Sequence, residues 1–213
     1  MQKSLTKNSI YNVIYTIANI LFPFATSIYV SRILLPAGVG KVASAQNIVS
    51  YFVTLAALGL PSYGVREFAK VREKKHERNK LFTELLLVNI ISTTLAVVGF
   101  IGLVVVNEGF SGQWALYAAC GLSIAFNYLN IDWMYQGLEE YGYITGRSLL
   151  IKGLSLLALF LFVKTREDYV IYALISSLAT GGNYVFNVLN ARKYVALDFS
   201  RIELKRHMKP VLL

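Results

Sequence analysis

The sequence holds one cysteine, two histidines and few charged residues, and each shortage excludes a class of protein. Cys120 lies in an apolar run, so no disulfide can form within this chain and no cysteine-based metal site is visible. His76 and His207 both lie in basic segments, and the sequence shows no Ser-His-Asp set, no metal-ligand cluster and no glycine-rich phosphate loop. Only 15% of the residues are charged, against roughly 25% in soluble domains. We therefore predict that the protein is not an enzyme, and that it has no catalytic and no metal-binding residue.

Long apolar runs fill the chain instead. Of 213 residues 55% are hydrophobic, and the mean hydropathy is +0.51. Five runs free of charge exceed the ~20 residues that a helix needs to cross ~30 Å of hydrocarbon. A sixth run carries Arg147 and Lys152 but includes "GLSLLALFLFV". Because lipid offers no hydrogen-bond partners, all six are predicted to be helices. The predicted spans are 8–31, 42–65, 85–107, 109–131, 143–163 and 169–191, so we predict an all-α membrane protein with a six-helix lobe over residues 1–191.

The positive charges predict how these helices are oriented. The net charge is +9, which in a soluble protein would suggest nucleic acid. Here the charges lie between apolar runs, so we predict membrane lipids as partners and no nucleic acid. If the N-terminus is inside, the outer loops hold Arg32, Lys41, Lys164 and Arg166, and the other 17 of the 21 Lys and Arg residues lie inside. This bias predicts a multi-pass protein of the bacterial cytoplasmic membrane, with the N-terminus and residue 213 on the cytoplasmic side.

Two basic segments lie outside the predicted spans. Residues 66–80, "REFAKVREKKHERNK", are predicted to extend the second span as a helix, which is either a solvated face near anionic headgroups or a contact for an anionic substrate. Residues 192–209 are predicted to be a cytoplasmic interfacial helix and linker, because apolar residues recur there at i, i+4 and i+7. Pro210 begins "PVLL", which predicts the start of a truncated seventh span at 210–213.

Polar residues form stripes along four of the spans. In the sixth they stand at i, i+4, i+7, i+11 and i+14, which is one face of a helix. The stripes contain Ser176, Thr180, Asn183, Asn187 and Asn190; Asn8, Asn12, Tyr15, Asn19 and Thr26; Asn47, Tyr51 and Thr54; and Ser123, Asn127 and Asn130. Such residues are costly against lipid. They either hold helices together, at about 0.6 kcal/mol per contact, or line a shared hydrated cavity, which we prefer for the set.

Prolines and cations inside the spans have two interpretations each. Pro23 and Pro61 are predicted to kink the first and second spans by removing a backbone hydrogen bond, although membrane helices also accommodate proline. Lys152, a third of the way into the fifth span, either snorkels to the inner interface or faces the path of an anion. Arg147 is closer to the interface and is expected to snorkel, and Arg32 is expected to anchor the outer side.

Residues 132–148, "DWMYQGLEEYGYITGRS", connect the fourth and fifth spans. The aromatic residues fit an interfacial belt. Glu139 and Glu140 are adjacent, so on a helix they point ~100° apart rather than converging on a substrate. We interpret them as gating residues or as salt-bridge partners of the basic segments, in preference to a catalytic pair.

Several of these stretches together resemble a known family. "SRILLPAGVGKVASAQNIVSYFVTLAALGLPSYGVREFAKVR" (31–72), "DWMYQGLEEYGYITGRSLLIK" (132–152) and "LKRHMKP" (204–210) resemble bacterial polysaccharide-biosynthesis flippases of the multidrug/oligosaccharidyl-lipid/polysaccharide exporter superfamily. The resemblance implies two six-helix lobes around a central cavity, with this chain as the N-terminal lobe and a C-terminal lobe missing. It also implies alternating access that moves an oligosaccharide on polyprenyl pyrophosphate, with a polysaccharide polymerase or assembly proteins as further partners.

The residues and the resemblance together define candidate sites. Hydroxyl and amide groups can hydrogen-bond sugars, and cations can pair with pyrophosphate. The candidate substrate contacts are Arg32, Arg66, Arg147, Lys152, Asn12, Asn19, Asn47, Asn127, Asn183 and Asn187, and the candidate gating residues are Pro23, Pro61, Glu139 and Glu140. No cofactor is predicted apart from a coupling ion, H⁺ or Na⁺, which the sequence does not identify.

Three other functions stay open at this point. A cation-coupled drug exporter of the same superfamily would need a buried acidic residue, and this half has none deep in a span. A membrane glycan polymerase or glycosyltransferase would use Asp132, Glu139 and Glu140. A non-transporting scaffold of the polysaccharide assembly complex would need neither.

Overall fold

The computed structural model describes residues 5–200 and 202–212, and within these ranges the protein is all-helical, without strands. The predicted all-α class is therefore confirmed. Residues 1–4 and 213, at the two ends of the predicted domains, lie outside the described residues. The helices are α1 (Leu5–Ala57), α2 (Leu60–Val71), α3 (Lys75–Val106), η1 (Glu108–Gln113), α4 (Trp114–Phe126), η2 (Asn127–Leu129), α5 (Asp132–Gly137), α6 (Tyr141–Phe162), α7 (Tyr169–Ala191) and α8 (Lys205–Leu212).

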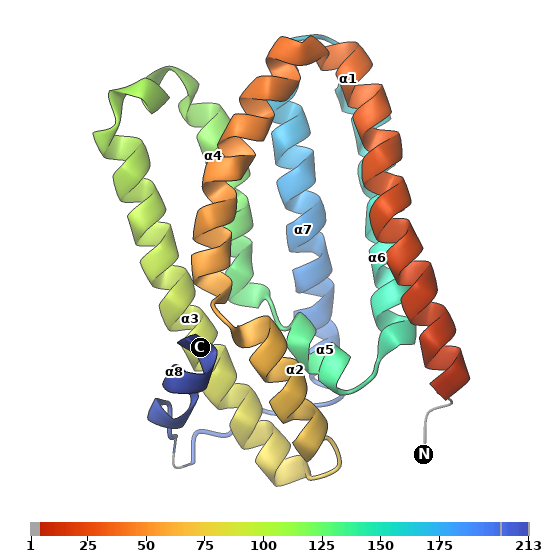
Figure 1. The fold of residues 1–213 in the computed structure, drawn as a ribbon, viewed down its shortest axis with the longest axis vertical. Coiled ribbons are helices and arrows are strands. Elements are labelled where there is room, and N and C mark those ends of the chain that lie inside the picture. The colour runs from red at the N-terminus through yellow and green to blue at the C-terminus, as the bar shows by residue number, and fades with distance from the viewer. Residues whose placement is uncertain (1–4, 201, 213) are drawn as a thin grey trace.

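Helix α1 consists of two helices that meet at a sharp kink at Leu35, at the top of Figure 1. Leu35 has φ 56° and ψ 172°. A residue before proline avoids the helical region, and a leucine with positive φ is strained, so this residue breaks the helix. Pro36 then fits the first turn of the next helix, which resumes at once. The non-helical outer loop expected between residues 31 and 42 is therefore reduced to one residue.

Pro23 and Pro61 were predicted to kink the first and second spans, but neither residue lies at an interruption of a helix. The first half of α1 continues through Pro23 with helical backbone. The second half ends at Ala57, and Leu58 (φ 46°) and Gly59 separate it from α2. Pro61 lies in the first turn of α2, where its missing N–H removes no helical hydrogen bond. The kink predicted at Pro61 is thus displaced to Leu58.

The remaining long helices complete the bundle. α4 packs against α7, and α1 packs against α3, α4 and α6. α7 begins and ends at the bounds predicted for the span at 169–191, and α6 begins two residues before the predicted span at 143–163. The fourth run was expected to be one helix over 109–131, but α4 covers only 13 residues between two 3-10 segments. The Asn107 side chain accepts a hydrogen bond from the Gly109 N–H, which favours a turn over a helix start there.

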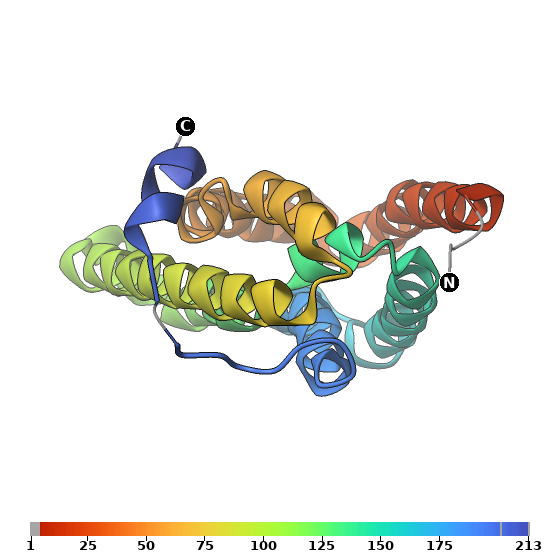
Figure 2. The same cartoon turned by 90° about the horizontal axis from the view of Figure 1, so that it is seen from below.

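Both basic segments differ from the helices predicted for them. Residues 66–80 form a helical hairpin, because α2 ends at Val71, a turn follows and α3 begins at Lys75. Residues 195–199 are extended rather than helical, and the predicted interfacial helix is reduced to α8. Figure 2 shows the chain leaving α7, passing beside the beginning of α3 and ending at α8. Its N–H groups bond to side chains of α3, as described below, and these bonds replace those that a helix would make.

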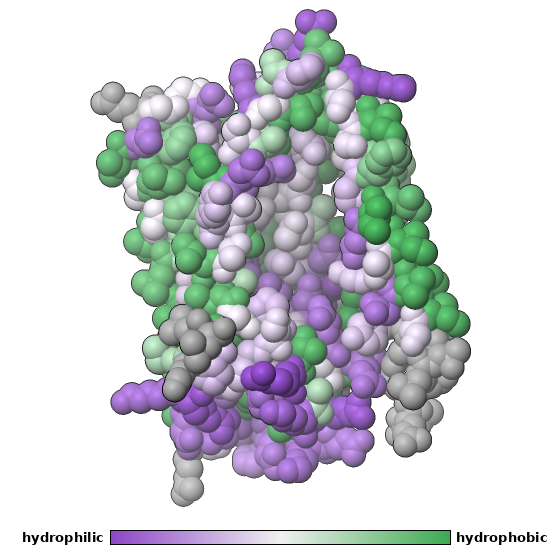
Figure 3. Space-filling view, viewed as in Figure 1, coloured by the Kyte–Doolittle hydropathy of each residue, from purple (hydrophilic) through white to green (hydrophobic). Residues whose placement is uncertain are grey.

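The outer surface of the bundle is apolar. Exposed fractions reach 66% for Ile20 on α1, 70% for Leu95 and 81% for Val106 on α3, and 63% for Leu161 on α6. Figure 3 shows these faces in green on both flanks, with polar residues gathered at the lower end and between the flanks. Exposed apolar surface on this scale needs a lipid surround. Among the described residues, the helical stretches 9–71 (which includes the kink at Leu35 and the break before α2), 75–106 and 141–162 are long and apolar enough to cross a membrane, and the stretch 114–129 is apolar but shorter.

Aromatic residues fill the core at the lower end of the bundle, where α2 and α5 make close contact. Phe68 packs edge-on against Trp133, with ring centroids 5.4 Å apart. Two glycines permit this approach: a Cβ on Gly64 would lie 2.9 Å from the Trp133 ring, and a Cβ on Gly137 would lie 2.6 Å from the Cβ of Phe68. The contact fixes α5, whose first residue is Asp132.

Candidate functional site

A groove lies between the second half of α1, α4 and α7, and most of its lining residues carry a hydroxyl group, although carbon atoms make up most of its exposed surface. Its volume is about 350 Å³. The residues lining it include Gln46, Ser50, Thr54, Ser123, Ser176, Ser177, Thr180 and Tyr184. The predicted stripe on α7 thus meets the stripes of the second and fourth runs, and the Ser123 hydroxyl donates to Ser177 Oγ at 2.9 Å. The groove thus brings hydroxyl-bearing residues of three helices together inside an apolar bundle.

An ion pair lies beside one end of this stripe. Arg147 of α6 is buried, with 4% of its side chain exposed, and both terminal nitrogens lie 3.2 Å from Oδ1 of Asp132. The Asn187 amide donates to the same oxygen, and Arg147 also donates to the Asn183 carbonyl at 3.0 Å. Asn183 directly precedes Tyr184, which lines the groove. The pair and the groove are therefore neighbours, and Arg147 does not snorkel.

Three buried polar atoms around this ion pair lack partners among the described residues. They are Nε of Arg147, Oδ1 of Asn183 and Oδ1 of Asn187. A buried polar group left without a hydrogen bond costs about 1–3 kcal/mol, so native proteins hold few of them. One unpaired donor on a cation and two unpaired amide oxygens therefore mark a place where a polar ligand would be stabilised.

Lys152 lies five residues after Arg147 on α6 and contacts the first half of α1. Its Nζ donates to Oδ1 of Asn19 and lies 6.0 Å from the ring centroids of Tyr15 and Phe22. Both rings contribute cation–π attraction. The structure thus groups two predicted contacts here, Lys152 with Asn19, and three around the ion pair, Arg147 with Asn183 and Asn187.

Asn127 lies apart from both groups in a satisfied network between α3 and α4. Its amide donates to Asn89 Oδ1 at 3.0 Å and to Thr93 Oγ1 at 2.8 Å. Its Oδ1 accepts from the Asn130 amide at 3.0 Å, and its carbonyl accepts from Asn89. The side chain is 1% exposed. In this structure Asn127 joins helices, which fits helix adhesion and not the hydrated cavity that we preferred for the stripes.

The other predicted contacts lie on the surface. Asn12, Asn47 and Arg32 are exposed, Arg32 three residues before the kink. Arg66 donates to Glu67 at 3.1 Å and lies 5.5 Å from the Tyr63 ring. These residues meet neither the groove nor the ion pair, and their predicted roles stay predictions.

The two adjacent glutamates have separate surroundings. Glu139, with φ 57°, forms an ion pair with Arg72 at 2.7 Å, so it has the basic-segment partner predicted for it. Glu140 interacts electrostatically with Tyr194. The predicted gating role of both residues stays a prediction.

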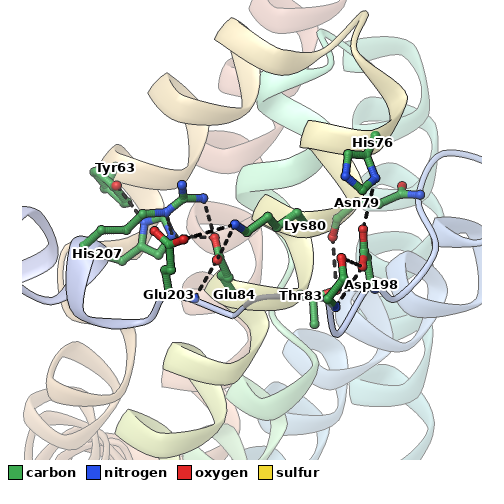
Figure 4. Close-up of polar contacts among 11 residues, drawn as sticks. Tyr63, His76, Asn79, Lys80, Thr83, Glu84, Asp198, Glu203 and His207 are labelled. Atoms are coloured by element: carbon green, nitrogen blue, oxygen red, sulfur yellow. Dashed lines mark hydrogen bonds and ion pairs between the residues drawn. The ribbon is translucent and has the colours of Figure 1, made fainter.

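A second polar cluster fixes the segment after α7, and we call it the C-terminal seam (Figure 4). Glu84 of α3, fully buried, accepts from the Glu203 N–H at 2.9 Å and from Arg206 at 2.5 Å. His207 lies 2.9 Å from the same carboxylate and 2.8 Å from the Tyr63 hydroxyl. The seam therefore joins α2, α3 and α8 through one buried carboxylate.

Side chains of α3 also bind the extended part of this segment. Asn79 accepts from the Ala196 N–H at 3.1 Å, and Thr83 accepts from the Asp198 N–H at 2.8 Å. Hydrogen bonds from the hydroxyl and the N–H of Ser200 lower the pKa of Asp198, which also lies 3.3 Å from His76. These contacts set the path that Figure 2 shows.

Sequence reasoning missed the role of Asp132 as the partner of Arg147, and it missed the seam at Glu84. The signal for Glu84 was weak, because a lone glutamate one residue before a predicted span resembles any interfacial charge. Within residues 5–200 and 202–212, no group of three His, Cys, Asp or Glu residues could hold a metal ion.

The apolar exterior of this helical bundle defines a multi-pass membrane protein, with the groove and the buried ion pair in its interior. The chain belongs to the polysaccharide biosynthesis protein family, whose model matches residues 5–212. Over 176 residues it is 22% identical to the "Putative O-antigen transporter" of Escherichia coli (strain K12), covering 83% of this chain and 42% of that protein. The chain thus spans about two-fifths of the length of this relative. No solved structure matches it. These findings confirm the family resemblance.

Proposed function

We propose that this chain forms the N-terminal lobe of a flippase that moves oligosaccharides linked to polyprenyl pyrophosphate across the bacterial cytoplasmic membrane by alternating access. The hydroxyl-lined groove beside buried Arg147 carries the proposal. A pyrophosphate and sugars cannot enter hydrocarbon alone, because their charges and hydroxyls would be desolvated. Hydroxyl and amide groups replace water around the sugars, and a cation balances the phosphates.

Six membrane crossings fit this arrangement. The two halves of α1, α3, the helical stretch 114–129, α6 and α7 each connect the two ends of the bundle (Figure 1). The hairpin of residues 66–80 and the segment after α7, which carry most of the basic residues, share the lower end, and this supports a cytoplasmic position for that end. A second lobe fits the greater length of the relative.

The alternative functions have less support. Two of the carboxylates that a glycosyltransferase would use, Asp132 and Glu139, form ion pairs with Arg147 and Arg72. Glu84 is buried but is bound by Arg206 and His207, so it does not offer an open cation site to a drug exporter. Whether H⁺ or Na⁺ drives transport, and whether a polymerase or other assembly proteins bind, belong to the same proposal.

Transport in vesicles tests the proposal. The full-length protein is reconstituted with a fluorescent polyprenyl-pyrophosphate oligosaccharide, and transbilayer movement is measured as loss of protection from an impermeant quencher. Lys152→Met is expected to slow movement at least tenfold, because it removes a membrane-embedded cation, whereas the matched change Lys164→Met in the exposed loop before α7 leaves it unchanged. Absence of movement by the unaltered protein would refute the proposed function.

A further inference from the structure

In the buried ion pair between Arg147 and Asp132, the guanidinium contacts only one of the two carboxylate oxygens. A guanidinium and a carboxylate pair best through two parallel bonds to two oxygens. Here both terminal nitrogens of Arg147 lie 3.2 Å from the same Oδ1, and the Asn187 amide donates to that oxygen as well. Arg147 Nε is buried and has no partner among the described residues. Asp132 therefore neutralises the cation without matching its donor pattern.

The unpaired atoms around Arg147 describe a complementary ligand. Nε of Arg147 needs an acceptor, and Oδ1 of Asn183 and Oδ1 of Asn187 each need a donor. A phosphate supplies anionic oxygens that match a guanidinium through two parallel bonds. A sugar hydroxyl supplies the donors. A phosphate bonded directly to a sugar carries both groups within one small unit.

The two partners of the ion pair differ in their freedom to move. Arg147 has 4% of its side chain exposed, whereas Asp132 has 30% exposed. Asp132 is also the first residue of α5, a helix of six residues, so its carboxylate can turn toward water while Arg147 stays enclosed. A ligand that competes for the guanidinium therefore displaces the aspartate and not the arginine.

We propose that Asp132 is an internal counter-ion that holds Arg147 until the phosphate of a glycosyl pyrophosphate displaces it, with Asn183 and Asn187 receiving hydroxyls of the first sugar. This proposal rests on the proposed function and specifies where in the lobe the phosphate–sugar junction of the substrate binds. Asp132 acts as a positioning and specificity residue, because any anion that enters must replace it.

Binding to the full-length protein in nanodiscs tests this exchange. Geranylgeranyl pyrophosphate serves as the probe, and geranylgeraniol serves as its uncharged control. Asp132→Asn keeps the shape of the side chain and removes the competing charge, so the affinity for the probe is expected to rise about tenfold. Arg147→Gln is expected to reduce the affinity to that of the alcohol, and the double variant is expected to behave like Arg147→Gln.

The double variant keeps the test valid if a single variant folds poorly, because it leaves no unpaired charge at the site. Glu77→Gln is the matched control, because it removes an exposed carboxylate that pairs with Lys74 at the same end of the bundle. Its affinity should equal that of the unaltered protein. An unchanged or weaker affinity in Asp132→Asn would overturn the proposal, and so would an equal gain in Glu77→Gln.

Two further comparisons distinguish this proposal from binding of a lipid headgroup and from the transport function. If phosphatidylglycerol in the nanodisc competes with the probe and phosphatidylcholine does not, a lipid headgroup occupies the site and the glycosyl pyrophosphate proposal fails. If Asp132→Asn tightens binding while the vesicle assay shows no transbilayer movement, the phosphate site stands and the transport function fails. If the vesicle assay shows transbilayer movement while Asp132→Asn leaves binding of the probe unchanged, the transport function stands and the phosphate-site proposal fails.

Discussion

Replacing Gly137 with alanine tests the contact that positions Asp132. A Cβ there would lie 2.6 Å from the Phe68 Cβ and 3.1 Å from the Val65 carbonyl oxygen, against ordinary contacts of 3.4 Å or more. Both neighbouring atoms are backbone or next to it, so no rotamer change relieves the overlap and α2 must move from α5. Overpacking of this kind costs about 1–3 kcal/mol, which lowers the melting temperature of a domain of this size by about 2–12 °C.

Thermal unfolding of the purified protein, followed by size-exclusion chromatography after heating, measures this change. Gly146→Ala is the matched control, because a Cβ at Gly146 of α6 meets no atom within 4 Å and alanine favours helix by about 0.5–1 kcal/mol. The control is expected to melt at the same temperature as the unaltered protein or slightly above. Equal melting of Gly137→Ala and Gly146→Ala would show that α2 and α5 do not approach as described.

Two more predictions concern the polar clusters outside the groove. Asn127→Ala leaves buried partners unpaired, so the free energy of unfolding should fall by about 1–3 kcal/mol, whereas Asn12→Ala on the exposed face should leave the melting temperature unchanged. Equal melting of both variants would contradict a structural role for Asn127. Glu84→Gln should loosen the C-terminal seam, so limited proteolysis within 195–204 should become several-fold faster. In the control variant Glu77→Gln, the protease should cut this segment at the same rate as in the unaltered protein. No acceleration in Glu84→Gln would show that the buried carboxylate does not fix the segment.

Periodicity along the chain predicted the parts of the fold that depend on local pattern. The bounds of α7 follow from a charge-free run, and its polar stripe places Ser176, Thr180 and Asn187 on one face, beside the groove and the ion pair. The break at Leu35 was not predicted, because the residue before a proline is only biased away from helix and many membrane helices tolerate the pair. The segment after α7 was likewise predicted to be a helix, because its backbone bonds to the α3 side chains Asn79 and Thr83 cannot be inferred from the local sequence pattern.

Pairing between distant residues accounts for most of what the sequence could not show at the site. Arg147 carried no sign that its partner lies 15 positions earlier, in a connection that aromatic residues and glycines made look interfacial. Glu84 is bound by residues more than a hundred positions away. Each pairing depends on how the helices meet in space, which hydropathy does not encode.

The asparagine stripes show why hydrogen-bond satisfaction separates candidate sites better than position does. Asn127 and Asn187 are equally plausible from their helical registers, and both are fully buried. Every polar atom of the Asn127 side chain has a partner within the bundle, so a substrate would gain nothing there without breaking an existing bond. Asn187 keeps one unpaired oxygen beside a buried cation. In the proposed site, substrate contact and helix adhesion therefore divide among chemically identical residues according to which atoms the fold leaves unsatisfied.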